Sequence, residues 1–178
     1  REQQLKELNQ ATQALQTAET KQEVADIGVE AASDVLDIPA NAIHLSDAGD
    51  TRLVPAAQND ELTSLIGDAP SLPMTDSIAG RVYRDGETTV IRDVTQEPNV
   101  HNSETYLRTH LYLPLADHGI LIAGSKYQVA NDKHDTAFGE LLAGTLVAAF
   151  DRVEREQNLR QRKLEISLLF EESPLGTI

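Results

Sequence analysis

The chain has 178 residues, of which 40% are hydrophobic and 25% are charged, a composition typical of a folded globular protein. Its 29 acidic and 15 basic residues give a net charge of −14, which disfavours binding to nucleic acid or to an anionic membrane surface. The absence of Cys excludes disulfides, thiolate metal ligands and thiol nucleophiles, and we expect a cytoplasmic location.

The first part of the chain predicts two helices. Residues 1–18 carry apolar side chains at the alternating three- and four-residue spacing of a coiled coil, and we expect an N-terminal signalling helix there. A second helix is expected to begin at Thr20, because Thr20 and Glu23 have the spacing of a capping box. Pro39 follows its expected end.

The middle of the chain predicts a hairpin, a short helix and a further strand. Ser77 is expected to cap the short helix, and Asp85-Gly86 to end it. Thr88–Ile91 is β-branched throughout and predicts a central strand. The expected strands are 42–46, 51–57 and 88–91, and the expected helix is 78–84.

The last part predicts strands at 111–115 and 120–129 around the turn Asp117-His118-Gly119. A long helix is expected from Thr136 to about Phe170. Strands joined by tight turns indicate the α+β class, with an antiparallel sheet flanked by N- and C-terminal helices that extend into a dimer bundle. One face of such a sheet would remain for a ligand or a partner. No apolar run approaches the roughly 20 residues of a membrane-spanning helix.

Several short segments carry a family resemblance through their order and spacing. They are the helix pair Leu8–Leu36, the hairpin Ala42–Ala57, Ser77–Val82, Asp85–Val94, Leu113–Leu115 with Gly119–Ala123, and Phe138 at the start of the closing helix. In this order they resemble the GAF family of sensory domains, from about Leu5 to Glu154. The resemblance implies a ligand-responsive module of a signalling protein, and not an enzyme.

The same resemblance divides the chain into a signalling helix at 1–18, a GAF-like domain at 19–154 and a linker helix at 155–170. Residues 171–178 look like the start of a PAS domain. This implies a multidomain sensor kinase or related two-component regulator, with neighbouring PAS or kinase-type domains as partners. The chain has only five Lys beside its many acids, and we expect a halophilic source.

Departures from the family limit the ligands that the resemblance implies. The cyclic-nucleotide-binding members carry a motif of which Asn131, Lys133 and Phe138 are present, but Leu142-Ala143 replaces its acidic pair. We therefore do not expect cyclic GMP or cyclic AMP. Covalent bilin attachment through Cys and the methionine-sulfoxide reductase activity of other members both require Cys, which is absent. The ligand and any cofactor stay unknown.

The resemblance places a ligand between the sheet and the connection Asp93–His110, which offers several hydrogen-bond donors over an apolar floor. The alternative is a loop that covers the sheet with no cavity beneath it. The candidate ligand-binding residues are His101, Tyr106, Arg108, His110, Ile91 and Asp93.

Catalytic and metal sites are weaker interpretations. His101, Glu104 and His110 could hold Zn²⁺ or Fe²⁺, but their spacing matches no ligand motif. The acidic segment Asp132–Asp135 is better explained as the start of a helix. Ser77 lacks the Gly-x-Ser-x-Gly context of an activated nucleophile. We expect neither a metal site nor a catalytic residue.

The terminal helices predict a homodimer, because both show apolar residues at heptad spacing. The candidate interface residues are Leu5, Leu8, Leu15, Leu146, Phe150 and Val153. Two functions from different classes remain open. The first is a sensory module that binds an unknown small molecule and relays a signal through its C-terminal helix. The second is a ligand-free structural dimerisation spacer between signalling domains.

Overall fold

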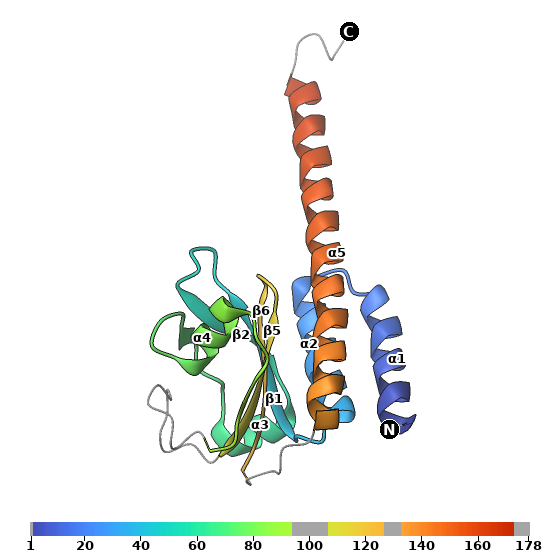
Figure 1. The fold of residues 1–178 in the computed structure, drawn as a ribbon. Helices are drawn as coiled ribbons and strands as arrows, with labels where there is room; N and C mark the ends of the chain where they lie inside the picture. The colour runs from blue at the N-terminus through green and yellow to red at the C-terminus, as the bar shows by residue number, and fades with distance from the viewer. Residues whose placement is uncertain (1, 94–106, 127–132, 173–178) are drawn as a thin grey trace.

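The computed structural model describes residues 2–93, 107–126 and 133–172 (Figure 1). The elements are α1 (Glu2–Gln16), α2 (Lys21–Val35), β1 (Ala40–Ser46), β2 (Arg52–Gln58), α3 (Asp60–Ile66), β3 (Leu72–Pro73), α4 (Ile78–Asp85), β4 (Thr89–Ile91), β5 (Thr109–Leu115), β6 (Gly119–Ser125) and α5 (Lys133–Glu172). The predicted α+β class with an antiparallel sheet and terminal helices is confirmed. Among the described residues, no helix is both long and apolar enough to cross a bilayer.

The sheet has six strands in the order β3-β2-β1-β6-β5-β4, and every neighbouring pair is antiparallel. Strands β1 and β6 form its centre. They approach closely at Gly119, where a Cβ atom would lie 2.0 Å from the carbonyl oxygen of His44. The sheet therefore requires glycine at this position.

Strand β4 corrects one prediction. Thr89–Ile91 pairs only with β5 and forms an edge of the sheet, so the expected central strand is wrong. Val90 is accordingly exposed. A β-branched run fits any half-buried pleated surface, and it does not distinguish an edge strand from a central one.

Three local predictions about helix ends are confirmed. The hydroxyl of Thr20 accepts a hydrogen bond from the backbone N–H of Glu23 at the start of α2. At the start of α4, the hydroxyl of Ser77 accepts one from Gly80. Gly86 then ends α4 in the left-handed conformation, with φ of 70°.

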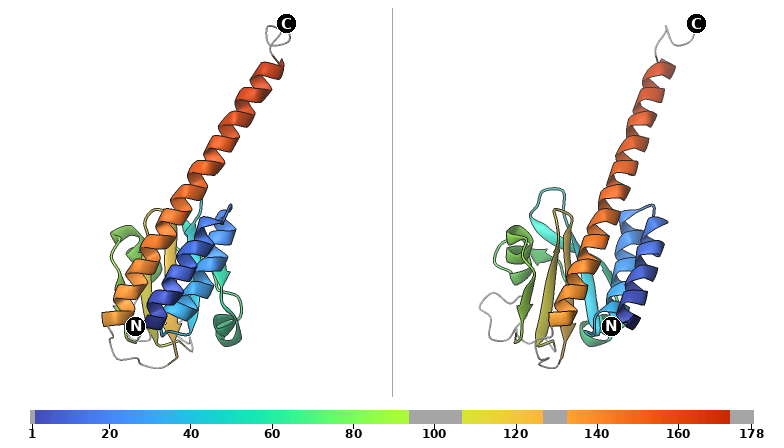
Figure 2. Two further views of the ribbon diagram at one scale, coloured as in Figure 1. Left: turned by 90° about the vertical axis from the view of Figure 1, so that its right-hand side faces the viewer. Right: turned by 45° about the vertical axis from the view of Figure 1, so that its right-hand side comes forward.

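The helices divide the molecule into layers (Figures 1 and 2). Helices α1, α2 and α5 lie on one side of the sheet, and α4 lies on the other. Helix α2 packs tightly because Gly28 faces the side chains of Ile43 and Leu146, which leave no space for a Cβ atom. The main core lies between the sheet and these helices, and α1 joins it through Ala11 and Leu15.

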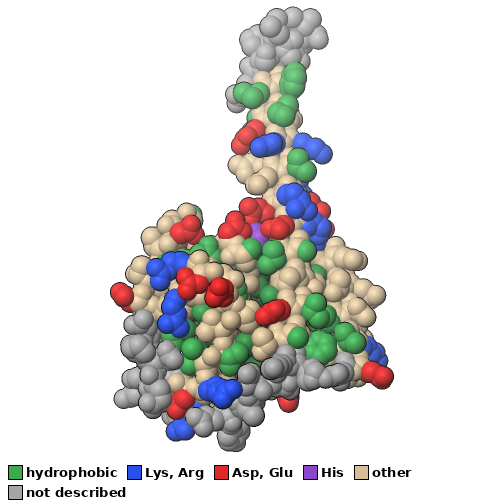
Figure 3. Space-filling view, viewed as in Figure 1, with side chains coloured by type: hydrophobic (Ala, Val, Ile, Leu, Met, Phe, Trp, Pro, Cys, Tyr) green, Lys and Arg blue, Asp and Glu red, His purple; other side chains and the backbone are tan. Residues whose placement is uncertain are grey.

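Helix α5 has 40 residues and falls into two parts. Up to Val153 it packs on the sheet and on α2, and beyond that residue it leaves the domain (Figure 1). Apolar side chains are exposed along the protruding part (Figure 3). They are Leu159, Leu164, Ile166, Leu168, Leu169 and Phe170.

The predicted dimer interface needs correction for this reason. Leu146, Phe150 and Val153 are each 0% exposed within a single chain, so they have no surface left for a partner. Leu15 is also buried, Leu8 is partly buried and Leu5 is exposed. Apolar residues at heptad spacing occur both in a coiled-coil interface and on the core-facing side of an amphipathic helix. The sequence pattern alone does not distinguish these two cases.

Candidate functional site

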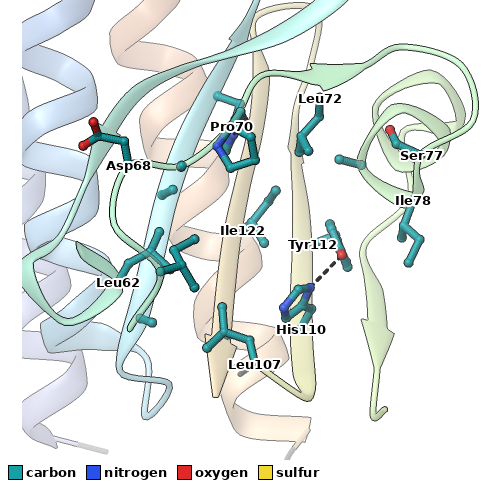
Figure 4. Close-up of a pocket in the computed structure, with 17 residues that line it drawn as sticks. Leu62, Asp68, Pro70, Leu72, Ser77, Ile78, Leu107, His110, Tyr112 and Ile122 are labelled. Carbon is teal, nitrogen blue, oxygen red and sulfur yellow. Dashed lines mark hydrogen bonds between the residues drawn. The ribbon is translucent and has the colours of Figure 1, made fainter. Parts of the chain in front are cut away.

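A cavity of about 450 Å³ lies on the face of the sheet opposite α2 and α5 (Figure 4). Its floor is formed by β1, β5 and β6, and its walls by α3, the loop that follows α3 and the start of α4. The lining residues are Ala40, Ala42, His44, Leu62, Ile66, Asp68, Ala69, Pro70, Leu72, Ser77, Ile78, Ala79, Leu107, His110, Tyr112, Ile122 and Gly124. We call this cavity the sheet pocket.

The alternation of side chains along the strands explains why the sheet pocket forms. On β1, Ala40 and Ala42 face the pocket. Ile43, which directly follows Ala42, points to the other face of the sheet and packs into the main core. Gly124 on the neighbouring β6 has no side chain. Three small residues on adjacent strands thus leave space that larger side chains would fill.

His44 supplies the first polar group of the pocket. Its Nε2 donates a hydrogen bond to the carbonyl oxygen of Pro70 at 3.1 Å, and this assigns the proton to Nε2. The buried Nδ1 is then an acceptor without a partner among the described residues. Burial lowers the pKa of His44, against the smaller opposing effect of the Pro70 bond. The imidazole is therefore neutral at pH 7.

His110 supplies the second polar group. Its Nδ1 lies 2.7 Å from the hydroxyl of Tyr112, and the two rings meet edge to face. The residue keeps some exposure, but its Nε2 is fully buried and has no partner in the described parts of the chain. Burial lowers the pKa of His110 to about 4. This imidazole is also neutral at pH 7.

The two imidazoles belong to different ends of the pocket. His44 pairs with Ile120 on β6 and His110 pairs with Gly124, four residues further along the same strand. At about 3.3 Å per residue, their backbones are separated by roughly 13 Å along the strand direction. The pocket thus has an apolar middle with an uncharged hydrogen-bonding group toward each end.

The structure brings one of the predicted site residues into this pocket. His110 lines it, whereas His101 and Tyr106 lie outside the described residues, as does Glu104 of the metal interpretation. Arg108 is exposed and does not line the pocket, although its backbone N–H bonds to strand β6.

The other two predicted residues also lie away from the cavity. Ile91 packs against Val82 and Tyr112 in a small separate core, and Asp93 is only partly buried. The alternative of a sheet face without a cavity is not supported, because the sheet pocket lies on that face. Sequence reasoning missed His44, whose only signal is a histidine placed between apolar residues of an alternating strand.

The two neutral histidines predict an acid-sensitive fold. Burial holds both pKa values below 6.5, the ordinary value for histidine, so the unfolded chain binds more protons than the folded chain below that pH. The free energy of unfolding therefore falls as the pH drops toward 4. For His110 the loss between about pH 7.5 and pH 5 is about 2 kcal/mol. Urea unfolding at the two pH values should show a smaller loss for His110→Gln than for the parent chain. An equal loss in both would contradict the assignment.

The start of α4 forms one pocket wall and depends on Ser77. The Ser77 hydroxyl donates to the carbonyl oxygen of Pro73 at 2.6 Å and accepts from the N–H of Gly80 at 2.9 Å. Ser77→Ala should lower the free energy of unfolding by about 1 kcal/mol, as the loss of an N-cap does elsewhere. The matched control is Ser64→Ala on the exposed face of α3, which should change it by less than about 0.5 kcal/mol. Equal effects in urea unfolding would argue against the capping role.

An antiparallel sheet with terminal helices on one side and a cavity on the other defines an α+β domain with a small-molecule-sized pocket. The model of the GAF domain family matches residues 18–151, and the chain belongs to this family. GAF domains are in general sensory or regulatory modules.

Solved structures share the fold at low sequence identity. The GAF domain of a phosphoenolpyruvate-protein phosphotransferase from Coxiella burnetii is 20% identical with a TM-score of 0.73, over 88% of this chain and 97% of that one. A putative GAF sensor protein from Burkholderia vietnamiensis is 19% identical with a TM-score of 0.71, over 86% and 97%. Free methionine-R-sulfoxide reductase from Neisseria meningitidis is 19% identical with a TM-score of 0.71, over 84% and 89%. No curated protein matches the sequence.

The reductase corrects the expectation that the chain is not an enzyme. That expectation treated family membership as an argument against catalysis, and it is wrong because the same fold forms an enzyme whose structure holds its substrate. Reductases from Staphylococcus aureus are also among the structural neighbours. The fold is therefore compatible with both regulation and catalysis.

Proposed function

We propose that this GAF domain is a sensory module that binds an uncharged small molecule in the sheet pocket. The observation that carries the proposal is a cavity of about 450 Å³ in which two buried imidazole nitrogens lack partners among the described residues. Buried polar atoms are nearly always hydrogen-bonded, and a ligand would satisfy these two. The volume lies within the usual range for small-molecule sites.

The character of the lining favours an uncharged ligand. Most lining side chains are apolar, and the imidazoles of His44 and His110 are neutral at pH 7. Asp68, which supplies the one carboxylate among the described lining residues, is exposed. A charged ligand would lose its hydration without gaining an opposite charge in the pocket. The preferred ligand has an apolar body and a hydrogen-bonding group at each end.

The arrangement of the sheet supports a relay from the pocket to α5. Strands β5 and β6 carry His110 and Gly124 on the pocket face and Leu113 and Leu121 on the opposite face. The opposite face packs in the same core as Leu146 of α5. A ligand that shifts these strands would therefore change the packing of α5, which continues as one helix out of the domain.

A second contact joins the two terminal helices. Arg152 of α5 donates to the carbonyl oxygens of Leu15 at 2.7 Å, in the last turn of α1, and of Ala18 at 2.8 Å, just after it. In this proposal the signal leaves through α5 toward neighbouring PAS or kinase-type domains in a cytoplasmic regulator. An interior filled with side chains would favour a structural spacer without a ligand. The sheet pocket is instead an open cavity.

The ligand is to be found by a thermal-shift screen of uncharged metabolites, followed by calorimetry of each compound that raises the melting temperature. The proposal expects one site per chain and an affinity that changes little with salt, because no ion pair is involved. A screen in which only charged compounds bind, with steep salt dependence, would overturn the uncharged class. The pocket variant described in the Discussion then tests the location.

The proposed homodimer uses the protruding part of α5. Leu164 continues the predicted heptad spacing, Leu168 lies one helical turn further along, and both are exposed. The double variant Leu164→Glu, Leu168→Glu should convert a dimer into a monomer in sedimentation equilibrium. The matched control is Arg162→Glu, which changes the charge by the same two units outside this seam. A parent chain that stays monomeric at high concentration would contradict the dimer.

A further inference from the structure

A second cluster of polar side chains lies away from the sheet pocket, where the β5–β6 turn meets α5. Asp117 and His118 belong to the turn, and Asp151 belongs to the last helical segment before α5 leaves the domain. Acidic side chains gather around a histidine at the foot of the protruding helix (Figure 3). One ligand-type atom from each of the three residues lies within 4.8 Å of the others.

The distances within this cluster are close to those around a bound metal ion. Nε2 of His118 lies 2.7 Å from Oδ1 of Asp151 and 3.7 Å from Oδ1 of Asp117. Nitrogen and oxygen ligands at 2.0–2.2 Å from a tetrahedral ion are about 3.4 Å from each other. The Asp151 contact must open by less than about 1 Å, and its side chain, 47% exposed, has the freedom to move.

The histidine is fixed before any ion arrives. Its side chain is 5% exposed, and its ring stacks on Phe150 with centroids 5.3 Å apart. Its backbone donates to Leu115 and accepts from Ser46, which holds the turn against β1. A ligand held by packing and by hydrogen bonds loses little freedom on binding a metal.

The local charge also favours a cation. Asp117, Asp151 and Glu154 surround the imidazole, and Lys21, 3.2 Å from Glu154, is the one cation paired with them among the described residues. Oε2 of Glu154 lies 3.6 Å from Nδ1 of His118. The Glu154 carboxylate thus lies on the side of the second ring nitrogen, just beyond hydrogen-bond distance, and a small movement would let it orient a metal-bound histidine.

We propose that Asp117, His118 and Asp151 bind a divalent first-row transition-metal ion, with Zn²⁺ as its representative. Nε2 of His118 supplies the nitrogen ligand, the two aspartates supply oxygen ligands, and Glu154 orients the ring. An imidazole nitrogen beside carboxylates selects such ions over Mg²⁺ and Ca²⁺, which prefer oxygen ligands alone. The ion would link the β5–β6 turn to α5 at its exit from the domain, independently of any ligand in the sheet pocket.

Isothermal titration of the tag-free 178-residue chain with ZnCl₂ tests this site, in buffer that contains excess Mg²⁺. We expect one saturable site per chain. Asp151→Asn and His118→Gln should each weaken Zn²⁺ binding by at least about tenfold. The matched control is Asp34→Asn, which removes one exposed carboxylate from α2 and should leave the affinity within about twofold. Circular dichroism and thermal melting check that each variant is folded.

Two results would overturn the site. One is the absence of saturable Zn²⁺ binding to the parent chain. The other is binding that Asp151→Asn and Asp117→Asn leave unchanged, which would locate the ion elsewhere. If His118→Gln does not fold because the ring supports Phe150, the two aspartate variants decide the question, because both side chains are substantially exposed. In the folded parent, a shift of the His118 Nε2 resonance upon Zn²⁺ addition is the expected spectroscopic sign.

Discussion

Replacing Phe150 with Ala is expected to lower the free energy of unfolding by about 3–5 kcal/mol, the cost typical of a large cavity in a packed core. Phe150 is 0% exposed and belongs to the core between the sheet and the helices. It also stacks on His118, whose backbone anchors the β5–β6 turn. The substitution removes both the packing of α5 and the support of that turn. Urea unfolding monitored by circular dichroism measures the loss.

The matched control lies on the same helix. Phe170→Ala removes an equal side chain from the protruding part, where Phe170 is 66% exposed, and should change the unfolding free energy by less than about 0.5 kcal/mol. Measurement at two protein concentrations separates any contribution from dimerisation, which depends on concentration. A loss below about 1 kcal/mol for Phe150→Ala would contradict the assignment of this part of α5 to the chain's own core.

Filling the sheet pocket should abolish most of the ligand affinity. Ala42 is 2% exposed, lies in the centre of β1 and lines the cavity. Ala42→Phe places a benzyl group in the space that a ligand would occupy. Steric overlap of this kind costs about 1–3 kcal/mol or more, which corresponds to at least about a fivefold weaker affinity. Calorimetric titration with a compound found in the screen measures the change.

The control for pocket filling is Val54→Phe. Val54 lies on β2, is 42% exposed and does not line the cavity, so the added ring should leave the affinity within about twofold. Thermal melting checks that both variants keep the fold. Equal affinity for the parent and a folded Ala42→Phe variant would show that the ligand binds elsewhere.

The sequence predicts local structure well because local structure depends on neighbouring residues. The caps at Thr20 and Ser77 and the helix end at Gly86 are set by residues within one turn, and all three are confirmed. The hairpins and the closing helix follow from turn residues and from hydrophobic periodicity in the same way. Their order then leads to the family, which the match over residues 18–151 establishes.

The candidate site was harder to predict because it joins distant segments. His44 and His110 are 66 positions apart in the chain, and only the placement of β1 and β5 on either side of β6 puts them in one cavity. Most of the predicted ligand residues were taken from one connecting segment, and among those that the structure describes His110 alone lines the cavity. The small size of Ala40 and Ala42 becomes informative only when their strand face is known.

The predicted dimer residues on α5 lie in the chain's own core for a related reason. Phe150 and Val153 recur at a spacing that serves a partner helix or the chain's own sheet equally well. The decision between the two depends on where the sheet lies, and the structure places both residues inside the domain. Leu164, at the far end of the same spacing, and Leu168, one turn beyond it, are exposed and remain available to a partner.

The most direct test of a ligand in the sheet pocket is native mass spectrometry of the parent chain and of Ala42→Phe, both produced in the same cells of the natural host and purified in parallel. If a ligand occupies the sheet pocket, we expect a stoichiometric non-covalent mass on the parent chain that is absent from the variant. Its dissociation and identification should reveal an uncharged molecule. A parent chain without any adduct, and without thermal stabilisation by any compound of the screen, would contradict the sensory function and favour a structural spacer.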